Sequence, residues 1–391
     1  MITVRDSLRD SSNGFGFLRL LFATLVLLDH AFPLGGYGQD PMWGWSKGQD
    51  TFGGISVSAF FAISGYLITK SAVSSDIIQF LWRRSLRIFP AYWFALLVTA
   101  FLLGPVVFFF ENSSLTGYFS AGENGPLQYI WKNAFLDIGQ YRIYDLLAKT
   151  TPYGATVGAS VFNGSVWTLI YEWRCYIFIG ILAAFAVLRK MPIVLAMITA
   201  SLYFLMLLQL CLPDKLAAIS PLTADVHLLR YSFLFMLGGV IARYSDRIEM
   251  DAKIGIFCWA VFIAALFKGG YLFLGYPALV YGLVWLASSM PAALKKVGAT
   301  NDYSYGVYIY GFPVQQLLAF FHVHQLGLLT YLSATIVITY ACAYISWHLI
   351  EKRSLKLKSA FLGKGIPYVR EIGRRISGSM AADRQLPKEN Q

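Results

Sequence analysis

Ten long apolar runs constrain the fold of this chain more than any other feature. An α-helix of about 20 mostly apolar residues crosses a bilayer, and only helices and closed barrels satisfy every backbone polar group there. We place the runs at residues 14–34, 52–70, 89–110, 165–188, 191–212, 226–243, 253–269, 271–290, 303–321 and 325–350. The sequence therefore predicts an all-α, polytopic integral membrane helical bundle with about ten transmembrane helices.

The composition agrees with this fold class. Hydrophobic residues make up 57% of the chain and charged residues 14%, and the mean hydropathy is +0.56, whereas a soluble domain is about 25% charged. The net charge of +11 does not indicate a nucleic-acid partner, because the Lys and Arg residues lie between apolar runs and in the tail, where they set membrane orientation. The four cysteines lie singly in apolar segments, so we expect neither a metal site nor a disulfide framework.

The basic residues also predict which helix ends face the cytoplasm. With both termini in the cytoplasm, most of the 32 Lys and Arg residues fall on cytoplasmic surfaces. We therefore expect cytoplasmic termini, a membrane-embedded domain over residues 1–350, and a basic, partly disordered cytoplasmic tail over residues 351–391. The tail has a possible amphipathic piece at residues 369–376. Segment 111–164 is too polar for a full span, so we expect short surface helices or a re-entrant element there.

The first run carries three ionisable side chains, which are costly at membrane depth and mark functional sites. Arg19 and His30 are eleven residues apart, about three turns at 3.6 residues per turn, so they share nearly the same helix face. About 16 Å separates them along the axis, which places a cation near the cytoplasm and a proton-transfer group near the outer surface. We expect Asp29 to point elsewhere, because adjacent residues do not share a helix face. The alternative is a polar stripe that only packs against neighbouring helices.

A basic connector precedes the third run and holds Arg83, Arg84 and Arg87. Arg83 and Arg87 are four residues apart, on one face of a helix. Arginine donates two parallel hydrogen bonds to phosphate, and Arg19 is expected at the same cytoplasmic level. We predict that these four arginines bind a phosphorylated cofactor. The alternative is a loop that only sets membrane orientation.

Ionisable side chains also gather at the predicted outer level. Beside Asp29 and His30, they include Glu172, Arg174, Asp225, His227 and Arg230. We expect a partly hydrated cavity in which His30 acts as general base, and Glu172 orients its imidazole or holds an acceptor hydroxyl. The alternative is a set of structural ion pairs, such as Glu172 with Arg230. In the second run, Ser64 and Gly65 are expected to allow close helix packing.

Six segments, in order, resemble the acyltransferase 3 family of integral membrane acyltransferases. They are Arg19 with His30, FFAISGYLI at 60–68, FLWRRSLRIFPAYW at 80–93, SVWTLIYEW at 165–173, SYGVYIYGFPV at 304–314 and HLIEKR at 348–353. The resemblance covers residues 14 to 353. The chain departs from it at Gly311, where many members have His, and at Arg353, where many have Pro.

The resemblance implies transfer of an acyl group, most commonly acetyl, from cytoplasmic acyl-CoA to a sugar hydroxyl. The acceptor would be a cell-surface or lipid-linked glycan at the bacterial inner membrane, and membrane lipid would surround the protein. Acetyl-CoA is then a donor substrate, and no permanently bound cofactor or metal is expected. We assign catalysis to His30, Glu172 and Asp29, binding of the CoA phosphates or pantetheine to Arg19, Arg83, Arg84 and Arg87, and acceptor binding to Trp167, Arg174 and Arg230.

Within this reading, we expect the thioester to insert along the first span and reach His30, which deprotonates the acceptor hydroxyl for direct attack. A covalent acyl-enzyme is less favoured, because the sequence shows no activated Ser or Cys. The main alternative is a transporter or flippase for a glycolipid or organic anion, since intramembrane Arg, His and Glu also mark transport pathways. A third interpretation is a structural or sensory membrane protein, in which the polar groups serve packing only.

Overall fold

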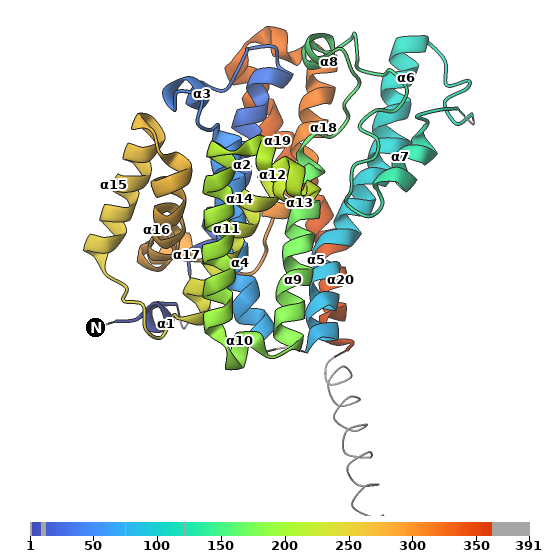
Figure 1. Cartoon of the computed structure of the whole chain (residues 1–391). Coiled ribbons are helices and arrows are strands. Elements are labelled where there is room, and N and C mark those ends of the chain that lie inside the picture. The colour runs from blue at the N-terminus through green and yellow to red at the C-terminus, as the bar shows by residue number, and fades with distance from the viewer. Residues whose placement is uncertain (1, 9–12, 75, 121, 362–391) are drawn as a thin grey trace, which may run out of the picture.

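Helices dominate the computed structural model, which describes residues 2–8, 13–74, 76–120 and 122–361. A helix lies at each predicted span (Figure 1): α2 (Phe15–Leu34), α4 (Phe52–Ser74), α5 (Ile77–Val98), α9 (Leu169–Ala184), α11 (Pro192–Cys211), α14 (Val226–Arg243), α15 (Ala252–Lys268), α16 (Tyr276–Ser289), α18 (Ser304–Phe320) and α19 (Leu328–Ser346). Within these described ranges, eight helical stretches are at least 18 residues long and apolar enough to cross a membrane. The all-α membrane bundle is confirmed. Because α15 and α18 have 17 residues each, the count of ten spans stays a prediction.

The third span begins earlier than the sequence predicted. Ile77–Asn112 is one helical stretch, in which a π-helical turn at Thr99–Leu103 joins α5 to α6 (Gly104–Asn112). The Asp76 carboxylate caps its start, because it accepts a hydrogen bond from the Gln79 backbone N–H at 2.7 Å. The basic connector is therefore the first part of α5, and its three arginines are fixed on a helix.

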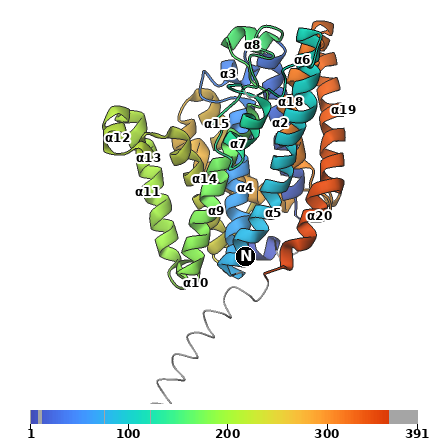
Figure 2. The ribbon, with the colours of Figure 1, turned by 90° about the vertical axis from the view of Figure 1, so that its right-hand side faces the viewer.

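The helix α4 lies at the centre of the bundle and packs against α2, α9, α14 and α16. Small residues allow these close approaches. An added Cβ at Gly65 would clash with the carbonyl oxygen of Phe235, and one at Gly238 would clash with that of Ala62. The expected close packing at Gly65 is therefore confirmed. The helices α11 and α19 lie at opposite edges of the bundle, with α4 and α9 between them (Figure 2).

Short elements distinguish the two ends of the bundle. The helices α1 (Val4–Ser7), α10 (Val187–Lys190) and α20 (Lys352–Ser354) lie at one end, and α3 (Pro41–Trp45) and α8 (Pro152–Val157) lie at the other (Figure 1). The first end carries the surfaces predicted to be cytoplasmic, so we call it the inner end and the opposite one the outer end.

Segment 111–164 and the tail complete the described chain. The segment contains the short helices α7 (Pro126–Asn133) and α8 joined by loops, as predicted. The helical stretch begun by α19 continues through α20 into a 3₁₀ turn at Leu355–Ser359, which packs against α5. The possible amphipathic piece at residues 369–376 lies outside the described residues.

Candidate active site

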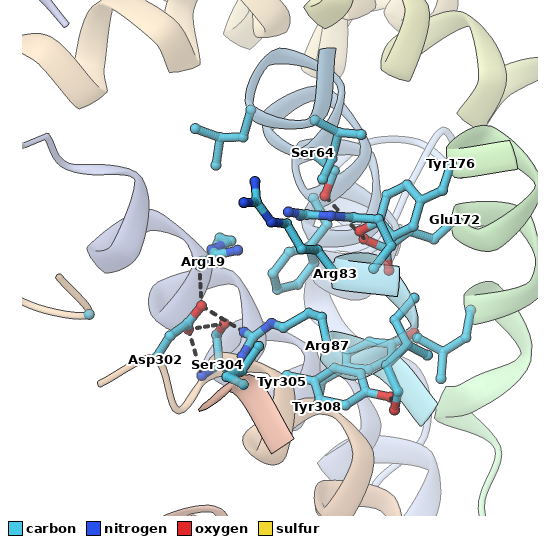
Figure 3. A pocket seen from close by; sticks show the side chains of 18 of the residues that line it. Arg19, Ser64, Arg83, Arg87, Glu172, Tyr176, Asp302, Ser304, Tyr305 and Tyr308 are labelled. Atoms are coloured by element: carbon cyan, nitrogen blue, oxygen red, sulfur yellow. Dashed lines mark hydrogen bonds and ion pairs between the residues drawn. The ribbon is translucent and has the colours of Figure 1, made fainter. Parts of the chain in front are cut away.

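A cavity of about 400 Å³ lies toward the inner end, between α2, α4, α5, α9 and α18. All four predicted donor-binding arginines line it: Arg19, Arg83, Arg84 and Arg87. In Figure 3, Arg19 and Arg87 point toward Asp302, and Ser64 lies beside Glu172. We call this space the inner cavity. The sequence correctly predicted that Arg19 meets the α5 arginines, although 64 residues separate Arg19 from Arg83 in the chain.

Arg87 anchors an ion network in the inner cavity. Its guanidinium contacts Asp302 at 2.7 Å and Glu351 at 3.2 Å. Arg19 pairs with the same Asp302 carboxylate (Figure 3). Ser304 donates to Asp302 from its hydroxyl at 2.5 Å and from its backbone N–H at 3.1 Å. Burial alone raises the pKa of Asp302, but the two arginines and Ser304 outweigh it and lower the pKa to about 2. Asp302 is therefore a charged anchor for both arginines.

Two guanidinium nitrogens in the inner cavity are buried without a hydrogen-bond partner in the described part of the chain, Arg19 Nε and Arg84 Nε. The Arg84 guanidinium lies over the Phe80 ring, 5.9 Å from its centroid. An unsatisfied buried donor costs about 1–3 kcal/mol, and a phosphate oxygen would satisfy it. These donors fit an anionic ligand.

Glu172 lies in the inner cavity and not beside His30, so its expected level in the membrane is wrong. Its carboxylate accepts hydrogen bonds from Ser64 Oγ at 3.2 Å and from Tyr176. Glu172 lies deeper in the membrane than His30. Ser165, which contacts His30, precedes Glu172 by seven residues, or about 10 Å of helix. Among the described ion pairs, none joins Glu172 to Arg230.

A second cavity, of about 260 Å³, contains His30 and is called the outer cavity here. Ser165 Oγ lies 3.4 Å from His30 Nδ1, and Asp29 Oδ2 lies 3.8 Å from His30 Nε2. The Phe312 ring packs edge-on against the imidazole, with 5.3 Å between centroids. Asp29 lines the same cavity, as expected for the outer group of ionisable side chains, although adjacent helical residues point in different directions. The side chains of adjacent helical residues point about 100° apart around the helix axis, and the cavity is wide enough for both to reach it.

The outer cavity has two carboxylates, Asp29 and Asp50, and one guanidinium, that of Arg230, in its described lining. Asp50 lines it, and Asp40 accepts hydrogen bonds from the backbone N–H groups of Met42 at 2.9 Å and Phe52 at 2.5 Å. Burial raises the pKa of both Asp40 and Asp50 to about 6, and the charge of nearby Asp29 adds to the rise. The sequence did not predict Asp50 as part of the cavity or Asp40 as a neighbour of Asp29.

The two cavities share a wall, because Val57 and Tyr308 line both of them. The Tyr308 hydroxyl donates to the Ser165 carbonyl at 2.6 Å, so the Thr168 hydroxyl, 2.5 Å away, is the donor in their contact. Ser165 therefore contacts this wall through its backbone and His30 through its hydroxyl. Side chains, not whole helices, separate the two cavities.

Similarity to known proteins extends over nearly the whole chain. The sequence model of an acyltransferase domain, that of the acyltransferase 3 family, matches residues 13–348. The chain belongs to the acyltransferase 3 family. It is 30% identical over 356 residues to the O-acetyl transferase of Shigella phage Sf6, covering 89% of this chain and 97% of that protein. It is 27% identical over 372 residues to nodulation protein 10 of Rhizobium leguminosarum bv. viciae, covering 90% and 95%. No solved structure matches the chain.

Family membership confirms the resemblance and establishes the protein as an acyltransferase. The structure places two of its three predicted acceptor residues, Trp167 and Arg230, in the outer cavity. Arg174 is not part of either cavity: its exposed guanidinium lies over the Tyr171 ring, 5.5 Å from the centroid. Successive helical residues turn by about 100°, so Arg174 faces away from the side of α9 that carries Glu172.

Several residues of this acyltransferase site were missed in the sequence. Asp302 lies in a loop with no motif, and Glu351 belongs to the HLIEKR segment, whose role the resemblance left open. A signal was available for both, since a carboxylate at the predicted cytoplasmic level is a natural partner for the buried arginines. Tyr308 carried no such signal, because α18 contains several tyrosines that look alike in sequence.

Proposed function

We propose that this acyltransferase transfers an acetyl group from cytoplasmic acetyl-CoA, bound in the inner cavity, to a sugar hydroxyl of a glycan or lipid-linked sugar in the outer cavity. One observation carries the proposal: the arginine-lined cavity and the His30 cavity share a wall at Val57 and Tyr308. The name of the phage relative, O-acetyl transferase, favours an acetyl group and an oxygen acceptor. We place the protein in the bacterial inner membrane, where cytoplasmic acetyl-CoA reaches the inner end.

The inner cavity supplies what an acyl-CoA donor needs. Arg87 is held by two carboxylates, while Arg19 Nε and Arg84 Nε have no hydrogen-bond acceptor among the described residues. Planar guanidinium groups bind phosphate oxygens by paired hydrogen bonds. Deeper in the cavity, the lining continues through Ser64 to Tyr308. In this proposal the CoA phosphates bind at the arginines, and the narrow pantetheine arm carries the thioester to the shared wall.

His30 acts as the general base in the outer cavity. As the acceptor oxygen attacks the thioester carbonyl carbon, His30 removes the hydroxyl proton. The new C–O bond forms, the C–S bond breaks, and the departing CoA sulfur takes up the proton from the imidazolium. Asp29, 3.8 Å from Nε2, favours the transient imidazolium. His30 is thereby neutral again when the products leave.

Ser165 could take either of two roles in this mechanism, and a substitution can distinguish them. Its hydroxyl lies 3.4 Å from His30 Nδ1, which suits either a hydrogen bond that orients the imidazole or a nucleophile activated by it. We favour the orienting role, because the Ser165 backbone carbonyl is held by Tyr308 at the wall between the cavities. Direct transfer to the acceptor then needs no acyl-enzyme.

The test is a sided transfer assay with the purified full chain in proteoliposomes. Labelled acetyl-CoA is added outside, and a bacterial membrane glycan extract is enclosed. The expected result is labelled acetyl ester on the enclosed glycan, absent from vesicles without protein. Labelling only when donor and glycan share a compartment would contradict the two-sided arrangement. Thermal melts in detergent confirm that the reconstituted protein was folded.

A further inference from the structure

The turn that ends the described chain forms part of the wall of the inner cavity. Leu355 and Lys358 line the cavity together with Arg83 and Arg84. Both residues lie beyond residue 348, where the match to the acyltransferase domain ends. This part of the wall is therefore not accounted for by the family resemblance.

Side chains of α5 hold the turn in place. Trp82 Nε1 donates to the Leu357 carbonyl at 2.8 Å, and the Lys358 carbonyl accepts hydrogen bonds from Gln79 Nε2 and, at 3.4 Å, from Arg83 Nε. The Trp82 ring also packs edge-on against Phe361, with 5.1 Å between centroids. These contacts fix the backbone of Lys358 at the cavity. Its long side chain keeps the reach that its four-carbon stem allows.

Charge is unevenly balanced along the inner cavity. Its described lining contains two acids, Asp302 and Glu172. Asp302 is engaged by Arg19 and Arg87, and Glu172 is engaged by hydroxyl donors. Neither contacts Lys358, which forms no ion pair in the part of the chain that the structure describes. The positive charge of Lys358 is thus available to an anion.

We infer that the turn Leu355–Ser359 belongs to the donor site and that Lys358 binds the phosphate on the ribose of CoA. This inference rests on the proposed function, since it takes acetyl-CoA as the donor with its thioester at Tyr308. Coenzyme A carries a diphosphate next to the pantetheine arm and a separate 3′-phosphate on the adenosine ribose, at the end far from the thioester. With the thioester at the shared wall, the ribose phosphate lies toward the inner end, where Lys358 stands. A compact ammonium on a flexible stem suits such a terminal phosphate.

The test compares binding of acetyl-CoA and acetyl-dephospho-CoA, which lacks only the 3′-phosphate, to the full chain in detergent by calorimetry. The wild type is expected to prefer acetyl-CoA. Lys358→Ala weakens acetyl-CoA binding by about tenfold, the effect of one lost charge-assisted hydrogen bond, and weakens acetyl-dephospho-CoA binding much less. Lys358→Arg restores most of the preference. The matched control is Lys356→Ala, because Lys356 is equally exposed and does not line the cavity.

A second variant tests the turn apart from its charge. Trp82→Phe keeps an aromatic ring beside Phe361 but removes the hydrogen bond to Leu357, and is expected to reduce the preference for the 3′-phosphate. If the wild type prefers acetyl-CoA and Lys358→Ala keeps that preference, the inference is wrong and the proposed donor stands. Equal losses in Lys358→Ala and Lys356→Ala would also overturn it, in favour of general attraction by a basic surface. If the wild type binds neither donor, the proposed function itself fails.

Discussion

The inner and outer cavities use charge in opposite ways. In the inner cavity, arginines outnumber carboxylates, and ion pairs as short as 2.7 Å hold Arg87 in place. In the outer cavity, Asp29 and Asp50 surround His30, whose polar neighbours lie at 3.4 and 3.8 Å. A rigid cationic site suits a polyanionic donor that must be held still. A loosely held imidazole suits a base that must gain and lose a proton.

The largest expected effect is on turnover, from a substitution in the outer cavity. His30→Ala is expected to lower kcat by about 10²–10⁴-fold, the usual contribution of a general base. The affinity for acetyl-CoA is expected to stay the same, because His30 does not line the inner cavity. Turnover is measured as CoA release and donor binding by calorimetry on the same preparation.

His322→Ala is the matched control for this variant. His322 is exposed at the outer end of α18 and lines neither the inner nor the outer cavity. Its turnover should equal that of the wild type. If His30→Ala loses donor binding as much as turnover, the two cavities are not functionally separate, and the assignment of His30 as base is wrong.

The inner cavity should respond in stability as well as binding. Arg87→Ala leaves two buried carboxylates, Asp302 and Glu351, without their shared partner. Removing one partner of a buried ion pair costs about 3–5 kcal/mol, so the free energy of unfolding should fall by that order. Denaturation in detergent micelles measures it. Arg174→Ala, which removes an exposed arginine on α9, should cost far less; equal losses would show that the network does not hold the inner cavity together.

Ser165 lies where the two cavities meet, and its loss is expected to have a moderate effect. Ser165→Ala removes one hydroxyl contact to His30, worth about 1 kcal/mol, so turnover should fall by about tenfold or less. The pH dependence of kcat should also shift, since the hydroxyl no longer orients the imidazole. Complete loss of turnover in a folded variant would instead favour an acyl-serine intermediate. Ser64→Ala provides a serine control on the inner side: its hydroxyl contacts Glu172 and not His30, so its loss should leave the pH dependence set by His30 unchanged.

The sequence predicted the parts of the site that depend on local spacing. The membrane helices follow from apolar runs, and the meeting of Arg19 with Arg87 follows from helical geometry and the predicted topology. Their shared partner Asp302 was missed. Its predicted cytoplasmic level was a signal, but 283 residues separate it from Arg19, and no local spacing joins the two. Only the packing of α18 against α2 brings Asp302 to the arginines.

The error at Glu172 has a similar cause. The apolar run predicts that Glu172 lies near the start of a span. It does not show that a 3₁₀ turn at Ser165–Thr168 precedes α9. That turn takes Ser165 to His30 and leaves Glu172 deeper, beside Ser64. The level of a residue in the membrane therefore depends on where its helix begins, which apolar periodicity alone does not define.

The smallest expected effect is a difference in how acids of the two cavities make stability depend on pH. Asp50, near the outer end, has a pKa raised by burial to about 6, so the folded protein binds its proton more readily than the unfolded chain. Its contribution is stabilising below pH 4 and is lost as the pH rises through 6. Asp302, near the inner end, has a pKa lowered to about 2 against the pull of burial, so its contribution is present above pH 4 and is lost only as the pH falls toward 2.

Between pH 5 and pH 7, Asp50 should therefore change stability, whereas Asp302 should not. Asp50→Asn is expected to flatten the dependence of the free energy of unfolding on pH in that window, by an amount of the order of 1 kcal/mol. Asp302→Asn should lower the free energy of unfolding equally at pH 5 and pH 7, because Arg19 and Arg87 lose their common carboxylate. Thermal melts of the two variants at both pH values make the comparison. A pH dependence that disappears in Asp302→Asn and persists in Asp50→Asn would contradict both assignments.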